Sequence, residues 1–256
     1  MDNEQKPKGY GSALDKALAV LELITEQHQA VGLPDLAAKM DMPRQSLHRI
    51  LLQLEELGLI IRDASRDRFF VGPRLSQLSV NALFSENHSM PARVILQELV
   101  NDIQESCNIG VLDGMDFVYL DRVQSKQSLR IHLDVGNRVP AYCTSGGKVL
   151  LAHLKPKMRR NLVELKELKI HTKTTLTTLS GLEKSFKAAL NSGYSVNNQE
   201  LTAGIVGVAV PITDSTGRAI AALACHAPLA RTSLDRLITY IPKLQASAQN
   251  LGHYWS

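Results

Sequence analysis

The chain has 256 residues, enough for two domains of ordinary size. An apolar fraction of 44% and a charged fraction of 21% are typical of folded proteins and exclude a largely disordered chain, while a net charge of +4 is too small to indicate a partner by itself. No apolar run reaches the roughly eighteen residues of a membrane span, and the polar N-terminus lacks the apolar core of a secretory signal. We therefore expect a cytoplasmic protein with no membrane partner.

The three cysteines, Cys107, Cys143 and Cys225, lie far apart and include no Cys-x-x-Cys pair. This spacing argues against a disulfide framework and against a zinc ribbon. We expect no metal and no cofactor. A redox switch that works through these thiols stays open as an alternative function.

Helical patterns begin after a polar tail, residues 1–11, which we expect to be disordered. Ser12 is a favourable cap for a helix that runs to about Gln27. The residues predicted to form its buried face recur at helical spacing and are Leu14, Leu18, Leu21 and Ile24.

A short helix, a turn and a longer helix follow within Leu33–Gly58. The first helix is predicted at Pro34–Met40, with proline in its opening turn, and residues 41–43 form the turn. The second is predicted at Pro43–Leu57, and Gly58 is its C-terminal cap. Its apolar residues lie three and four positions apart, at Leu47, Ile50, Leu51, Leu54 and Leu57.

Two short predicted strands, Leu59–Arg62 and Arg68–Val71, flank the turn sequence DASRD. Three helices followed by such a hairpin are typical of a winged helix-turn-helix domain, which we place at residues 12–73. Residues 74–88 have apolar side chains at helical spacing but are too few to form a core. We therefore predict a linker helix that packs on another surface, such as a partner subunit.

The second predicted domain spans residues 89–256, and its fold class is α+β. It opens with a helix at Pro91–Ser106, and further helices are predicted near Ser145, near Ser180 and from about Ser233. The expected architecture is a mostly antiparallel sheet flanked by helices. Its predicted strands are IGVL, FVYLDRV, Leu129–Leu133, Ile205–Ile212 and Ala219–Cys225.

The exposed start of the helix at Pro43–Leu57 carries side chains suited to reading DNA. In a helix-turn-helix, this end of the second helix enters the major groove. Arginine can bind guanine and glutamine can bind adenine through two hydrogen bonds, whereas serine and histidine reach bases or phosphates. An amphipathic helix with a merely solvated polar face is the alternative, but the neighbouring turn and hairpin favour DNA. We predict double-stranded promoter DNA as a partner, contacted by Arg44, Gln45, Ser46, His48 and Arg49.

Positive charge in the N-terminal domain is local. Residues 1–72 contain nine Lys or Arg and eleven Asp or Glu, a net charge of −2. We expect Arg66 and Arg68 to contact phosphate or a minor groove, which adds affinity without base specificity. The arginines that gather around the predicted hairpin are Arg62, Arg66, Arg68 and Arg74.

Residues 143–148, CTSGGK, precede an apolar helix. Small residues at a helix N-terminus expose backbone N–H groups, and the helix dipole favours an anion there. We expect a carboxylate to bind on Ser145 and Gly146, with help from the hydroxyl group of Thr144 or Ser145.

Several longer stretches resemble segments of one protein family. They are SALDKALAVLELI, LEELGLIIRD, FFVGPRL, VGNRVPAYCTSGGKVLLAHL and QELTAGIVGVAVPITDSTGRAIAALACHAP. Through them the chain resembles the IclR family of bacterial transcriptional regulators over essentially its full length, and the last two stretches are the most specific. The resemblance implies a DNA-binding domain, a linker helix that helps dimerisation, and an effector domain for a small organic acid. It also implies a homodimer or a dimer of dimers.

The same resemblance implies further effector-binding residues. On it, the small and polar pocket positions are Asn197, Gly207, Ala224 and His226, and the apolar wall is Ile131, Val139 and Ile205. Family members that bind very small oxoacids have an aspartate, a cysteine and two serines at the first four positions. Losing the aspartate and gaining His226 suits an anionic ligand, and Gly207 and Ala224 leave more room. We expect a larger acid, aromatic or cyclic, from a catabolic pathway; a purely structural His226 bonded to backbone is the alternative.

These observations predict a ligand-responsive transcription factor that controls a catabolic operon as a repressor or an activator. We expect no enzyme and no catalytic residues, because Ser145 has no histidine at a motif spacing and no carboxylate pair stands out. Two alternatives stay open: an enzyme that converts a small acid and carries an accessory DNA-binding domain, and the cysteine-based redox regulator.

Overall fold

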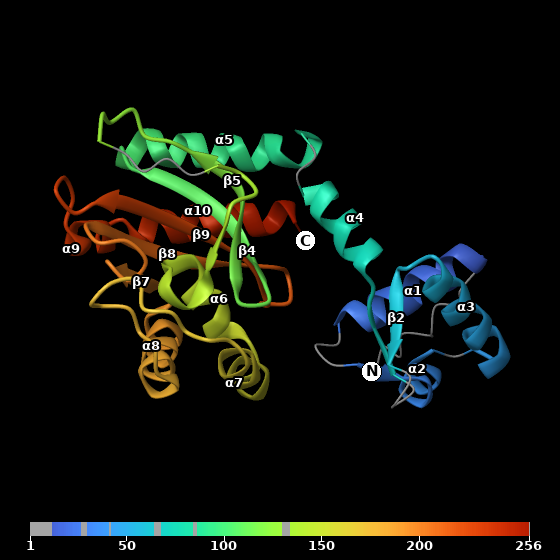
Figure 1. Ribbon diagram of the computed structural model, residues 1–256. Coiled ribbons are helices and arrows are strands. Elements are labelled where there is room, and N and C mark those ends of the chain that lie inside the picture. Colours follow the sequence, from blue (N-terminus) through green and yellow to red (C-terminus); the bar gives the residue numbers. More distant parts are fainter. Residues whose placement is uncertain are drawn as a thin grey trace, which may run out of the picture. The chain divides into compact units, whose positions relative to one another are not determined.

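The structure is a computed structural model that describes residues 12–26, 30–40, 42–63, 68–83, 86–129 and 134–255. The chain forms two compact units, Met1–Leu83 and Phe84–Ser256 (Figure 1), which are described one at a time. Some features predicted from the sequence lie outside the described residues. They are the tail 1–11, Asp41, Arg66, and most of the strand Leu129–Leu133, including Ile131.

The first unit is a winged helix-turn-helix domain, as predicted. Its three strands form an antiparallel sheet in the order β1-β3-β2. Strand β1 was not predicted, because two residues are too few to show an alternating pattern. The elements are α1 (Ala13–Glu26), β1 (Val31–Gly32), α2 (Leu33–Lys39), α3 (Arg44–Glu56), β2 (Ile60–Asp63), β3 (Arg68–Val71) and α4 (Pro73–Leu83).

Local capping explains where α1 and α3 begin and end. The Asp15 amide donates to Ser12 Oγ at 3.1 Å, and the Ser12 amide donates to Asp15 Oδ2 at 2.8 Å, which is the reciprocal capping expected at Ser12. Helix α3 begins one residue later than predicted, at Arg44, because Pro43 takes the cap position with φ of −58°. Gly58 follows the helix at φ +70°, a conformation that glycine adopts without strain.

The prediction for the buried face of α1 was wrong at its first two leucines: Leu14 is 68% exposed and Leu18 is 49% exposed. Ile24 is buried as predicted and Leu21 is partly buried, while Val20 and Ala17 complete the buried face. Residues three and four apart share a helix face, so the buried face is rotated away from the leucine stripe. On α3 the predicted Leu47, Ile50, Leu51 and Leu54 are buried, but Leu57 is 49% exposed.

The second unit is α+β, with a six-stranded sheet in the order β6-β5-β4-β9-β8-β7. All five neighbouring strand pairs are antiparallel, as predicted. The helices are α5 (Glu86–Ile103), a 3-10 turn η1 (Ala141–Cys143), α6 (Ser145–His153), α7 (Pro156–Leu165), α8 (Leu179–Ser192), α9 (Leu234–Ile238) and α10 (Ile241–Tyr254). The strands are β4 (Ser106–Asp113), β5 (Asp116–Val123), β6 (Arg138–Pro140), β7 (Ser195–Asn198), β8 (Ile205–Thr213) and β9 (Ala219–Pro228).

Helices cover both faces of this sheet (Figure 1). One face packs on α5 and α10 through large side chains, including Ile109 on β4, Val208 on β8 and Leu223 on β9. The opposite face packs on η1, α6 and α8, and its strand residues include Ala209 and Ala224. Successive strand residues point to opposite faces, so β8 and β9 present larger side chains to α5 and α10 and small ones to α6. The small side leaves room for α6 and for a cavity.

Several element boundaries differ from those predicted. Helix α4 ends at Leu83 and α5 begins at Glu86, so the linker helix is shorter than 74–88 and the second unit begins before residue 89. Pro91, the predicted first residue of this helix, is the sixth residue of α5. The last predicted helix is divided into α9 and α10, because Pro242 has no N–H for a bond to the preceding turn. Helix α7 and strands β6 and β7 were not predicted.

Candidate functional site

The first candidate site is the exposed start of α3. Arg44, Gln45, Ser46, His48 and Arg49 are all exposed, as the sequence predicted. The opposite face of the same turns is buried in the core. The helix can therefore present five polar side chains to a DNA groove without disturbing its packing.

The arginines near the wing have different roles in the structure. Arg68, on β3, is exposed and available to DNA. Arg74 belongs instead to the domain itself, because its Nη1 donates to the carbonyl of Leu57 at 3.2 Å, at the end of α3. The guanidinium of Arg62 lies over the Phe69 ring, 5.8 Å from its centroid. The arginines that cluster around the hairpin in the sequence are therefore not all equally available to contact DNA.

The second candidate site is a cavity of about 170 Å³ in the second unit, between the small-residue face of the sheet and the first turn of α6. Seven of the residues predicted for effector binding line it. They are Thr144, Ser145, Gly146, Asn197, Ile205, Ala224 and His226. Residues of five separate elements or loops therefore converge on one cavity, although they are up to 82 positions apart in the sequence.

Of the other predicted positions, Gly207 supports the cavity without lining it. A Cβ atom there would meet Ser145 Oγ and the His226 Cβ atom at 3.3 Å each, so glycine lets α6 approach β8 closely. Val139 packs in the core on this side of the sheet, paired with Phe117, but does not line the cavity.

Sequence reasoning missed five lining residues. They are Asn108, Phe117, Tyr119, Leu201 and Thr202. A signal existed for two of them: Phe117 and Tyr119 alternate on one predicted strand and so share a face. No such pattern marks Asn108, which precedes the predicted strand IGVL.

The first turn of α6 offers backbone donors to the cavity. Thr144 is the N-cap, and its Oγ1 accepts from the Gly147 amide at 3.1 Å and lies 3.3 Å from the Ala141 carbonyl. The threonine hydroxyl is therefore engaged in capping. The amides of Ser145 and Gly146 precede that bond, at the positive end of the helix dipole, where an anion is favoured.

His226 is held by Asn108 on the neighbouring strand. Its Nδ1 lies 3.0 Å from Asn108 Nδ2, and because an amide nitrogen donates, Nδ1 accepts and the proton resides on Nε2. Nε2 is buried and has no hydrogen-bond partner among the described residues. Burial, assisted by the positive charge of Arg122, lowers the pKa of His226 to about 3. The imidazole is therefore a neutral donor at pH 7, and its bond is to a side chain rather than to backbone.

The thiols have the character of core residues. All three cysteines are buried. Burial raises the pKa of Cys143 to about 12, and a hydrogen bond with Cys107 and burial raise that of Cys225. Because the thiolate is the reactive form, these environments disfavour redox sensing.

Within the described ranges, no group of three or more His, Cys, Asp or Glu could hold a metal ion, and no helix could cross a membrane.

These features define a class of protein: a winged-helix DNA-binding regulator that carries a separate ligand-binding domain. Comparison with known proteins gives the family. Residues 13–64 match the IclR helix-turn-helix domain, and residues 81–253 match the C-terminal domain of the bacterial transcriptional regulator IclR. The chain belongs to the IclR family of bacterial transcriptional regulators.

Individual relatives agree with this assignment. A protein of Cupriavidus necator named as a transcriptional regulator, SauR, is 37% identical over 240 residues, which are 94% of this chain and 95% of that protein. The crystal structure of Thermotoga maritima IclR is 26% identical, with a TM-score of 0.63, and covers 94% of this chain and 97% of its own. The inducer-binding domain of Acinetobacter PobR, a double mutant in complex with 3-hydroxybenzoic acid, is 31% identical, with a TM-score of 0.59. That match covers 63% of this chain and 95% of the PobR domain. The chain resembles regulators rather than enzymes.

The first prediction concerns base reading by α3. Arg44→Ala and Gln45→Ala should each weaken binding to the cognate DNA site by roughly 1–3 kcal/mol, because a two-bond contact to one base is lost. Binding to unrelated DNA of equal length should change little. Titration of both DNAs by fluorescence anisotropy measures the difference, and equal losses on the two DNAs would refute base reading.

Arg68→Ala is the matched control on the wing. It should weaken binding to every DNA by a similar factor, because a phosphate contact carries no sequence information. It should also reduce the slope of log affinity against log salt by about one. A loss confined to the cognate site would instead assign Arg68 to base reading.

The second prediction concerns the stability of the second unit at acid pH. The pKa of His226 is about 3 in the folded state and about 6.5 when unfolded, so the unfolded state takes up the proton first as pH falls. Stability should therefore be fully present above pH 6.5 and decline from there towards pH 3. Between pH 7 and pH 5, urea titration should show about 2 kcal/mol more loss for the wild type than for His226→Gln. The exposed His153→Gln is the control, and an identical decline in all three proteins would contradict the prediction.

Proposed function

We propose that the protein is a ligand-responsive transcription factor whose effector is a small aromatic or cyclic carboxylic acid, and that it controls a catabolic operon. The observation that carries this proposal is the cavity at the N-terminus of α6, lined on one side by backbone donors and on the other by rings and apolar side chains. Each part of the cavity favours one part of such a ligand.

The polar end suits a carboxylate. Ser145 and Gly146 supply amide donors at the start of α6, and the cavity lining contains no Asp or Glu side chain. The neutral imidazole of His226 adds an N–H donor, and the buried cation of Arg122 is close enough to lower its pKa. An anion therefore finds donors and positive potential, with no like charge to repel it.

The apolar end suits a single ring. Phe117, Tyr119, Leu201 and Ile205 contribute most of the apolar lining. An apolar cavity of about 150 Å³ holds a benzene molecule, so the volume of about 170 Å³ is sufficient for one six-membered ring with a small substituent. The PobR domain that resembles this unit was solved with 3-hydroxybenzoic acid, a ligand of this size and chemistry.

Control of DNA binding would follow from a shift between two conformational populations. An acid that binds one conformation better than another moves the protein towards it. Coupling energies of this kind are typically about 1–3 kcal/mol, which changes promoter occupancy several-fold or more. The same coupling serves a repressor, which the acid releases, or an activator, which it recruits.

The proposed regulator acts as a homodimer or a dimer of dimers, because two reading helices are needed for two half-sites on the DNA. Support comes from apolar side chains that the first unit leaves exposed: Leu14 and Leu18 on α1, and Leu78 on α4, which is 50% exposed. Such side chains are more often covered by a partner than left in water when they gather in a patch.

The third prediction tests the effector class by a thermal-shift screen. Benzoate, 3-hydroxybenzoate and cyclohexanecarboxylate should raise the melting temperature, because a ligand of the folded state stabilises it by mass action. The corresponding amides, which lack the anionic group, are the controls and should have little effect. If none of the acids binds, or if the amides stabilise equally, the proposed effector class is wrong.

Filling the cavity then locates the bound acid. Ala224→Leu places a large side chain among the lining residues and should raise the dissociation constant of the acid more than tenfold. Binding of DNA by the acid-free protein should be preserved. Arg218→Ala, which is exposed at the far end of the same β8–β9 hairpin, is the control. Wild-type acid affinity in Ala224→Leu would place the ligand elsewhere.

The fourth prediction tests the subunit contact. The double substitution Leu14→Glu/Leu18→Glu should lower the molar mass measured by sedimentation equilibrium, because charged side chains resist burial in an interface. Leu165→Glu on α7 replaces another exposed leucine, 86% exposed, and serves as the control. An unchanged mass in the double variant would exclude the α1 leucines from the interface.

A further inference from the structure

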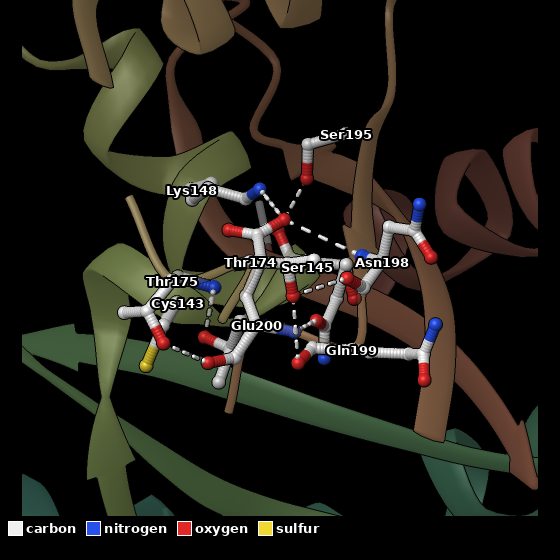
Figure 2. A network of polar contacts seen from close by, with 12 residues as sticks. Cys143, Ser145, Lys148, Thr174, Thr175, Ser195, Asn198, Gln199 and Glu200 are labelled. Atoms are coloured by element: carbon white, nitrogen blue, oxygen red, sulfur yellow. Dashed lines mark hydrogen bonds and ion pairs between the residues drawn. The ribbon is translucent and has the colours of Figure 1, made fainter. Parts of the chain in front are cut away.

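A buried ion pair connects two walls of the effector cavity. Lys148 Nζ on α6 lies 2.5 Å from Glu200 Oε1, in the connection between β7 and β8. The two side chains are only 2% and 7% exposed. Figure 2 shows this pair within a larger network of polar contacts.

Each partner is close in sequence to residues that line the cavity. Lys148 is three positions after Ser145, so the two lie one turn apart on α6. Glu200 directly precedes Leu201 and Thr202 and follows Asn197, all of which line the cavity. The ion pair therefore joins the wall that carries the anion donors to the wall formed by the β7–β8 loop, residues 199–204.

Further hydrogen bonds order the loop around Glu200. The Glu200 amide donates to Asn197 Oδ1 at 2.8 Å, which orients a cavity side chain. The hydroxyls of Thr174 and Thr175 donate to the carbonyls of Asn198 and Glu200 at 2.9 and 2.7 Å (Figure 2). These bonds hold the loop to residues 172–175, and the bonds described next hold it to α6.

Two contacts tie this assembly to α6: the Lys148–Glu200 pair and a hydrogen bond from Ser195 Oγ to the carbonyl of Ser145. Both reach the first two turns of the helix. Residues 195–200 are thus fixed at two points to the part of α6 that carries the amides of Ser145 and Gly146.

The ion pair is not expected to add much to the folding stability of the protein. Desolvating two charges offsets much of their attraction, and replacing a buried pair with apolar residues is often neutral. Burial lowers the pKa of Lys148, which shows the desolvation directly, while Glu200 acts in the opposite direction. Geometric specificity is the benefit that such a pair can supply.

We propose that Lys148 and Glu200 are positioning residues that fix the β7–β8 loop against the first turn of α6, and that this distance sets the affinity for the acid. The proposal rests on the proposed function, because it concerns the same cavity. Neither residue lines the cavity, so they act through Ser145, Asn197 and Leu201.

The experiment compares three variants with the wild type. Lys148→Met and Glu200→Gln each remove one charge, and Lys148→Met/Glu200→Met removes both and leaves no unpaired buried ion. The probes are benzoate, 3-hydroxybenzoate and cyclohexanecarboxylate, and any that bind the wild type are used. The dissociation constant is measured by calorimetry and the stability of each protein by urea titration. Amide hydrogen exchange reports the mobility of residues 198–202.

All three variants should bind the acid at least tenfold more weakly than the wild type and should show faster exchange at residues 198–202. The double variant should recover stability but not affinity, because an apolar pair packs without setting the same distance. Acid-free DNA affinity should stay within about twofold of the wild type.

Arg159→Met is the matched control, because it breaks the Arg159–Glu183 pair between α7 and α8, which measures 2.7 Å and does not line the cavity. It should lower stability and leave the dissociation constant unchanged. If the double variant recovers affinity together with stability, or if all variants bind like the wild type, the positioning role is wrong while the effector class stands. If no probe binds the wild type, the proposed effector class fails and this proposal falls with it.

Discussion

The difference in side-chain size between the two faces of β8 and β9 is the constraint on which the cavity of the second unit depends. On β8, Val206, Val208 and Val210 point towards α5 and α10, whereas Gly207 and Ala209 point towards α6. Large residues fill the first interface completely, and small residues allow a helix N-terminus to approach the second. A cavity with backbone donors at its end accompanies this asymmetry, because Gly207 and the neighbouring small residues let the first turn of α6 lie close to the sheet.

In the first unit the constraint is electrostatic, because a DNA-binding domain here has a net negative charge. A domain with net charge −2 over residues 1–72 has no general attraction for DNA, so any affinity must arise from the local group on α3 and the wing. Keeping Arg74 in a bond to the end of α3 removes one cation from that group.

Much of this structure could be predicted from the sequence, and the exceptions have physical reasons. Capping at Ser12 and Gly58 and the periodicity of α3 are local signals, and they were predicted correctly. The exposure of Leu14 and Leu18 was not predicted. Helical spacing shows that apolar residues share one side of a helix, but it does not show which side faces the core. In the effector unit, the residues at the start of α6 were recognisable from helix chemistry, and Asn197 and His226 only from the family resemblance. Asn108 and Leu201 reach the cavity through strand register and loop path, which no short pattern encodes.

The anion preference that we propose for the cavity would come largely from neutral groups. Lys148, the cation nearest in sequence to the anion donors, is paired with Glu200, and His226 is uncharged at pH 7 because its pKa is about 3. The donors among the described lining residues are neutral: backbone amides, the imidazole N–H of His226, and hydroxyl and amide side chains such as those of Ser145 and Asn197. Hydrogen bonds from neutral donors are weaker than those from charged ones. Affinity then depends on how well the donors and the ring-lined wall fit one molecule at the same time. A sensor built in this way can release its ligand when the concentration of that ligand falls. Its selectivity would then depend on the distance between the start of α6 and the β7–β8 loop more than on charge. On this proposal, the contacts that set the distance between those walls belong to the effector site as much as the residues that line it.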